Sequence, residues 1–79
     1  MELDPENALA YCNRGKAELG LNQNELAIAD YDKAIELDPN LTEAYYYRGT
    51  AKSKLGLKES AGEDHRKGIE LEFASYSLK

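Results

Sequence analysis

The chain has 79 residues, a formal net charge of −5 and one cysteine, which together allow a single small domain and exclude an internal disulfide bond. The acidic balance opposes nucleic acid or an anionic membrane surface as the main partner. No apolar run approaches the length of a membrane span and there is no secretory signal, so the sequence predicts a soluble cytoplasmic protein.

The first helix is expected to begin at Asp4 or Pro5 and to end near Gly20. Two stripes of side chains run along it at helical spacing. The first stripe, expected to pack against a second helix, consists of Ala8, Tyr11, Gly15 and Leu19. The second stripe, which faces elsewhere, consists of Leu9, Cys12, Asn13, Lys16 and Gly20.

A second helix is expected within residues 27–39. Its apolar stripe consists of Ala27, Tyr31, Ala34 and Ile35. Asp38 and Pro39 close this helix, because proline disfavours helical geometry in the residue before it. Either Asp38 or Asn40 is expected to cap a third helix that continues to about Leu55.

The sequence repeats itself with a period of 34 residues, which is the spacing from Glu2 to Glu36. Of the 36 residue pairs from Glu2 with Glu36 to Leu37 with Leu71, 17 are identical, so the chain is an internal duplication. The residues of the second stripe of the first helix are not repeated in the second half of the chain. At the same spacing its counterparts are Glu43, Tyr46, Tyr47, Thr50 and Lys54, and none of these five pairs is identical.

The fourth helix is the weakest element of the predicted fold. Gly62 and Gly68 stand where the second helix has Ile28 and Ala34, and each glycine costs about 1 kcal/mol of helix propensity relative to alanine. No proline ends this helix, so residues 72–77 are expected to extend it. The apolar stripe that continues along the extension consists of Ile69, Phe73 and Tyr76.

Both repeats carry the same charged pair and the same helical glycine. Arg14 lies toward the packed side of the first helix and needs a carboxylate, and a salt bridge to Asp30 is expected. The second repeat predicts the equivalent pair of Arg48 with Asp64. The glycines, Gly15 and Gly49, are expected to allow close approach of the paired helix.

Each first helix holds a small residue and a tyrosine followed by Arg-Gly, and each second helix holds an alanine. These motifs are Ala10-Tyr11 with Arg14-Gly15, Ala44-Tyr45 with Arg48-Gly49, and Ala27 and Ala61. With Leu-Asp-Pro closures and the 34-residue period, residues 2–71 resemble the tetratricopeptide repeat family, most of all its bacterial members. The pattern departs after Leu71, where Glu72 and Phe73 replace Asp-Pro.

The resemblance implies an all-α fold: an α-solenoid of two helix-turn-helix repeats, with four antiparallel helices and a C-terminal helical extension. It divides the chain into the end of a preceding repeat (residues 1–7), repeat 1 (8–41), repeat 2 (42–73) and a helical tail (74–79). Because Met1 is followed at once by a repeat end, we expect a fragment of a longer array. A short protein that begins at a degenerate repeat end is the alternative.

The resemblance also implies a concave groove, lined by the first helix of each repeat, that holds a peptide or partner protein. The candidate groove residues are Leu9, Cys12, Asn13, Lys16, Glu43, Tyr46, Tyr47, Thr50 and Lys54. Tyr46 and Tyr47 are the strongest of these, because tyrosine offers a large contact area at low entropy cost. The alternative is that both are half-exposed tyrosines on a solvated helix.

Some related grooves hold a terminal carboxylate between lysine, arginine and asparagine side chains. Asn13 and Lys16 supply fragments of such a clamp, but Cys12, Glu43 and Tyr47 occupy places that need basic or amide groups. A terminal carboxylate is therefore not the expected ligand, and Glu43 is expected to repel it.

The sequence predicts no enzyme, metal site or cofactor. Cys12 and His65 are the only candidates for nucleophile or base chemistry, and they lie on different helices of different repeats. His65 replaces Tyr31 and is expected to be a packing aromatic, while Cys12 is expected to be groove-side or buried. The alternative to a groove that binds a partner is self-assembly, with homo-oligomers formed through Ile69, Phe73 and Tyr76 at an exposed repeat end.

Overall fold

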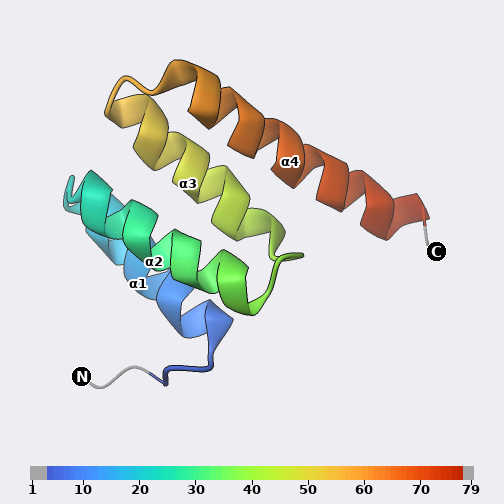
Figure 1. Ribbon diagram of the computed structural model, residues 1–79, viewed down its shortest axis with the longest axis horizontal. Helices are drawn as coiled ribbons and strands as arrows, with labels where there is room; N and C mark the ends of the chain where they lie inside the picture. Colours follow the sequence, from blue (N-terminus) through green and yellow to red (C-terminus); the bar gives the residue numbers. More distant parts are fainter. Residues whose placement is uncertain (1–3, 78–79) are drawn as a thin grey trace.

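The computed structural model describes residues 4–77, with side chains up to residue 74, and that part of the chain is entirely helical apart from its connections. The four helices are α1 (Ala8–Gly20), α2 (Asn24–Leu37), α3 (Thr42–Lys54) and α4 (Lys58–Ser77). Successive helices run in opposite directions and each packs on the next, forming two helical hairpins in sequence (Figure 1). The predicted all-α architecture is confirmed, and α4 extends as expected through residues 72–77.

The turn inside each hairpin has the same backbone geometry in both repeats. Asn22 has φ 61°, and Gly56, at the equivalent position of repeat 2, has φ 83°. Asparagine and glycine are the residues that adopt this left-handed conformation most readily. It closes the turn by letting the amide of Gln23 donate to the carbonyl of Glu18 at 2.8 Å, and the amide of Leu57 to that of Lys52 at 2.9 Å.

Two predicted helix starts were wrong. Helix α1 begins at Ala8 and not at Asp4 or Pro5, because Asn7 caps it by accepting the Ala10 amide at 3.2 Å. Neither Asp38 nor Asn40 caps α3, which follows Leu41 without a side-chain capping bond. The Asp38 carboxylate accepts the Asn40 amide at 3.1 Å, so it stabilises the preceding turn.

The core is built from small residues and one large aromatic ring. Tyr31 and Cys12 are fully buried, among alanines from three helices. A Cβ atom on Gly15 would lie 2.8 Å from Cζ of Tyr31, and one on Gly49 would lie 2.6 Å from Cδ2 of His65. The close helix approach predicted for both glycines is confirmed, as is the packing role of His65.

Both predicted salt bridges are present, and each is bidentate. Nε and Nη2 of Arg14 donate to Asp30 at 2.8 and 2.7 Å, and the same atoms of Arg48 donate to Asp64 at the same distances. Burial alone would raise the pKa of Asp64, but the hydrogen bonds from Arg48 and Lys52 lower it below its ordinary value. These pairs connect the two helices of each repeat through the ionised carboxylates.

The repeats differ beside these pairs. In repeat 2, Nζ of Lys52 lies 3.0 Å from Oδ2 of Asp64. The equivalent residue of repeat 1 is Glu18, whose carboxyl lies beside Asp30 and whose Oε1 is buried without a hydrogen-bond partner among the described residues. The pKa of Glu18 is raised to about 7, mainly by burial and further by a hydrogen bond to Asp30 and the charge of Asp30. The charge of Arg14 acts in the opposite direction but does not cancel this increase. Repeat 1 therefore holds two carboxyl groups where repeat 2 holds a carboxylate and an ammonium group.

Candidate functional site

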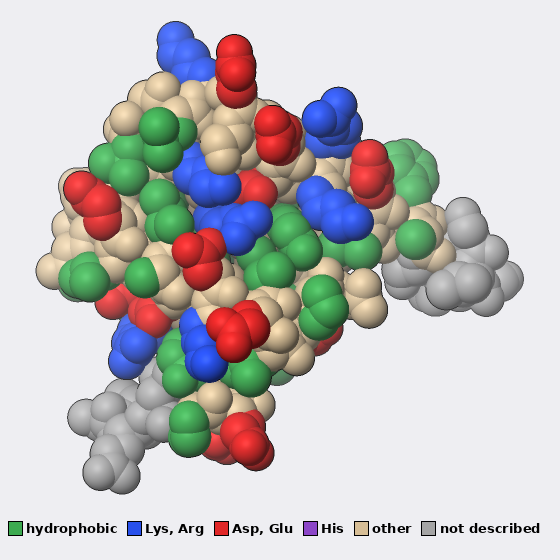
Figure 2. All heavy atoms as spheres, in the orientation of Figure 1, with side chains coloured by type: hydrophobic (Ala, Val, Ile, Leu, Met, Phe, Trp, Pro, Cys, Tyr) green, Lys and Arg blue, Asp and Glu red, His purple; other side chains and the backbone are tan. Residues whose placement is uncertain are grey.

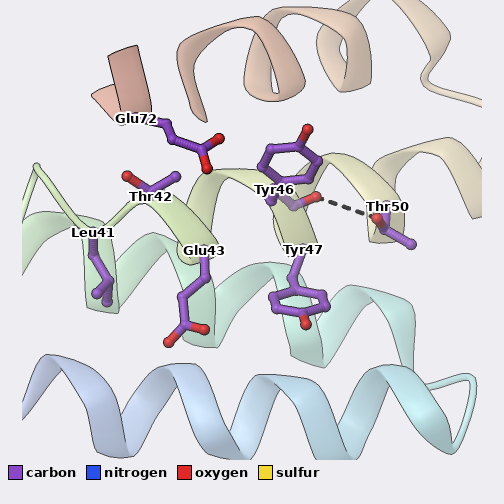
Figure 3. A pocket seen from close by; sticks show the side chains of 7 residues that line it. All are labelled: Leu41, Thr42, Glu43, Tyr46, Tyr47, Thr50 and Glu72. Carbon is purple, nitrogen blue, oxygen red and sulfur yellow. Dashed lines mark hydrogen bonds between the residues drawn. The ribbon is translucent and has the colours of Figure 1, made fainter. Parts of the chain in front are cut away.

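A hollow of about 580 Å³ lies along α3, and Figure 3 shows the side chains that line it. They are Leu41, Thr42, Glu43, Tyr46, Tyr47, Thr50 and Glu72. Four of them, Glu43, Tyr46, Tyr47 and Thr50, were predicted from the variable stripe of the third helix. The site therefore combines α3, the loop before it and one residue of α4.

The two tyrosines of the hollow point to different sides of α3 (Figure 3), and each contacts an aromatic ring of another helix. The Tyr47 ring stacks on Tyr31 of α2, with ring centroids 6.2 Å apart and an interplanar angle of 16°. The Tyr46 ring lies toward α4, with its centroid 5.4 Å from that of His65. Gly68 makes this contact possible, since a Cβ atom there would lie 2.9 Å from Cδ2 of Tyr46. Both tyrosines remain accessible, with exposed fractions of 41% and 37%.

An ion pair closes the side of the site that faces α1. Nζ of Lys16 lies 3.0 Å from Oε2 of Glu43 and 5.1 Å from the centroid of the Tyr47 ring. The hydrogen bond from Lys16 to Glu43 raises the pKa of the lysine. Lys16 is thus already engaged by a carboxylate of the same site, which reduces its capacity to bind an acidic ligand.

Cys12 does not line the hollow on α3. Its side chain is fully buried, so a partner cannot contact it, and of the two predicted environments the buried one is correct. Burial, together with the Glu43 carboxylate, raises the pKa of the thiol to about 11. The thiol is therefore protonated at neutral pH and acts as a core group rather than a nucleophile.

The remaining predicted residues lie outside the hollow. Leu9, Asn13 and Lys54 are exposed, but none of them lines it. On α4, Ile69 and Phe73 are exposed, and the side chain of Tyr76 lies outside the described residues. Acidic and basic side chains are interspersed over the face of the molecule shown in Figure 2, without a broad basic patch on that face.

Sequence reasoning missed three residues of the hollow. Thr42 could have been found, because it lies four residues before Tyr46 and eight before Thr50, on the same side of the helix. Glu72 carried no such signal, since its position depends on how α4 packs on α3. Leu41 belongs to the loop before α3, where helical spacing does not apply.

Among the described residues, no group of three or more histidine, cysteine or acidic side chains is placed to hold a metal ion. In the same part of the chain, no helix has both the length and the apolar character needed to cross a membrane.

In a comparison with protein families, a model described as a TPR repeat matches residues 16–56. The chain belongs to the tetratricopeptide repeat family. Members of this family are protein-protein interaction modules, and the fold of this chain supports that general role. A search of curated proteins gave no match.

Two solved structures show the same tetratricopeptide repeat arrangement. The crystal structure of MamA matches with a TM-score of 0.87 and 28% identity, over 91% of this chain and 42% of that one. The first tetratricopeptide repeat domain of Spaghetti (RPAP3), bound to the HSP90 peptide SRMEEVD, matches with a TM-score of 0.86 and 35% identity, over 87% of this chain and 55% of that one. The present chain thus spans about half the length of each.

Proposed function

We propose that the chain binds an extended or helical peptide segment of a partner protein in the hollow on α3. The observation that carries this proposal is the pair of exposed tyrosines, Tyr46 and Tyr47, each fixed from behind by another aromatic ring. Rings that are already ordered lose little conformational entropy when a ligand covers them. The mechanism is display of a rigid surface, without a chemical reaction on the ligand.

The related RPAP3 structure supports a peptide as the kind of ligand, because it was solved with a peptide bound. The charges of the present site favour a peptide that is basic, unlike the acidic peptide in the RPAP3 structure. Glu43 and Glu72 both line the hollow, and Lys16 is paired with Glu43. We therefore propose a ligand that places an apolar side chain between the tyrosines and a basic group near Glu72, rather than an acidic terminus.

The test is selection of ligands from a random peptide library, followed by titration of two matched variants. Thr50→Arg fills the hollow, whereas Ser53→Arg adds the same side chain and charge to α3 at an exposed position outside it. We expect the selected peptides to be basic, and Thr50→Arg to weaken their binding by about tenfold or more while Ser53→Arg leaves it unchanged.

Either of two results would contradict this function. One is the absence of any selected peptide that binds the folded chain. The other is equal binding to the Thr50→Arg and Ser53→Arg variants, which would place the ligand elsewhere. The peptide SRMEEVD serves as an acidic comparison and should bind more weakly than the selected peptides.

A further inference from the structure

Glu43 and Tyr47 of α3 form a cation site at the edge of the hollow, and the ammonium group of Lys16 fills it. Nζ of Lys16 lies over the Tyr47 ring, 5.1 Å from its centroid, and 3.0 Å from Oε2 of Glu43. A carboxylate beside the face of an aromatic ring attracts an alkylammonium ion through the charge pair and the cation–π contact together. The occupant of the cation site therefore shows which chemical group the site binds.

The contact between Lys16 and Glu43 is not part of the packing that the two repeats share. The pairs of arginine with aspartate recur in both repeats and join the two helices of one repeat. Lys16 and Glu43 instead join α1 of repeat 1 to α3 of repeat 2. Their counterparts in the other repeat are Thr50 and Leu9, neither of which is charged. The fold of a repeat thus does not require this ion pair.

Lys16 can leave the cation site at a low cost in stability. The side chains of Lys16 and Glu43 are 36% and 40% exposed, compared with 17% and 8% for Arg48 and Asp64. An accessible ion pair adds little to stability, because water solvates both groups when they separate and because ordering a long side chain costs entropy. A second ammonium group can therefore replace that of Lys16 while the domain stays folded.

We propose that a lysine side chain of the bound peptide takes the place of the Lys16 ammonium between Glu43 and Tyr47. Lys16 is then an internal competitor that fills the cation site when no ligand is bound. The Glu43 side chain points from α3 toward α1, away from Tyr46 (Figure 3). A peptide that lies over Tyr46 needs a long side chain to reach this carboxylate, which a lysine supplies and a chain amino terminus does not. This assignment deepens the peptide-binding function, on which it rests, by naming one residue of the ligand.

The test uses a small molecule, N-acetyl-lysine N-methylamide, so that it does not depend on finding a peptide. Its binding is followed through the amide resonances of Glu43 and Tyr47 in isotope-labelled chain. Lys16→Met keeps an unbranched side chain and removes the ammonium group. We expect this variant to bind the lysine derivative at least about threefold more tightly than the wild type, because the internal competitor is gone. Lys16→Gln, which also removes the charge, should show the same gain.

The matched control is Lys33→Met, which makes the same substitution at another accessible lysine. Lys33 is 40% exposed and lies 3.6 Å from Glu36 on α2, so it forms an ion pair outside the cation site. This variant should bind the lysine derivative as the wild type does. Adding Glu43→Gln to Lys16→Met should abolish the gain, because the amide keeps the shape of the side chain without its charge.

Two further small molecules define the chemistry of the ligand. N-acetyl-norleucine N-methylamide lacks the ammonium group and should not distinguish Lys16→Met from the wild type. Glycine N-methylamide carries a free amino terminus without the lysine stem and should bind Lys16→Met more weakly than the lysine derivative does.

The exchange of lysines is overturned if neither Lys16 variant gains affinity for the lysine derivative, or if Lys33→Met gains as much. Equal binding of glycine N-methylamide to Lys16→Met would also overturn the assignment to a lysine side chain. The peptide-binding function fails separately, through the absence of any selected peptide. Selected peptides that bind Lys16→Met no more tightly than the wild type would leave that function standing and contradict only the exchange.

Discussion

The carboxyl pair of repeat 1 makes the stability of this domain depend on pH in a direction opposite to that of an ordinary salt bridge. Glu18 is half-buried beside Asp30, and its pKa is raised to about 7 from an ordinary value of 4.5. Between these values the folded state holds the proton more tightly than the unfolded state does. Stability contributed by the protonated carboxyl is therefore complete below pH 4.5 and is lost as the pH rises through 7.

The substitution Glu18→Gln removes this dependence, because the amide keeps a donor for Asp30 and does not titrate. Each pKa unit corresponds to about 1.4 kcal/mol, and solvent screening of a partly exposed carboxyl reduces the full value. We expect the variant to be more stable than the wild type by about 1–2 kcal/mol at pH 8, and equally stable at pH 4. In a domain of this size, that gain raises the melting temperature by about 5–10 °C.

Thermal unfolding followed by circular dichroism at pH 4 and pH 8 measures this difference directly. Glu63→Gln is the matched control, since Glu63 is an exposed glutamate on α4, and its effect should be small at both pH values. Glu18→Lys reproduces the arrangement of Lys52 beside Asp64 and should also stabilise the domain at pH 8. If the melting temperatures of Glu18→Gln and the wild type differ equally at both pH values, the stability cost is not linked to a proton and the reasoning fails.

Further predictions concern α4 and the ion pair of repeat 2. Gly62→Ala should stabilise the domain by about 1 kcal/mol in chemical unfolding, since no atom lies within 4 Å of its Cβ position. Gly68→Ala should instead destabilise it, because the new Cβ meets the Tyr46 ring; a gain like that at Gly62 would contradict the contact. Arg48→Leu should cost about 3 kcal/mol at pH 7 by removing a partner of the buried Asp64. The pKa of Asp64 is lowered in the folded state, so the stability contributed by its ion pair is lost as the pH falls through that pKa, and the cost should be smaller at pH 3 than at pH 7. A cost that is equal at both pH values would count against the ion pair.

The features repeated in both halves of the sequence could be predicted with their partners. Arg14 and Asp30 recur as a pair at the equivalent positions of repeat 2, so a shared structural reason was the simplest explanation, and the observed geometry confirms it. The same holds for Gly15 and Gly49, each of which lies against the ring of the equivalent residue on the next helix, Tyr31 or His65.

The features that differ between the halves could not be predicted, because their effect depends on distances that a sequence does not contain. The sequence shows that repeat 1 has Glu18 where repeat 2 has Lys52. Only the fold shows that these side chains lie beside Asp30 and Asp64. The cost of Gly68 to helix propensity was visible, whereas its contact with Tyr46 was not. The helix starts failed because an aspartate side chain can bond to the backbone of a turn instead of capping a helix, as Asp4 and Asp38 do.

Glu72 gives the hollow a wall that belongs to α4, a helix that packs only on α3 within the described residues. A helix held on one side opens locally at a low free-energy cost, and each such opening removes that wall. A ligand that contacts Glu72 binds only the closed form, so it must slow amide hydrogen exchange along α4 as it binds. If the proposed peptide binds in the hollow, occupancy of the hollow and order in the last helix are thus two measures of a single equilibrium.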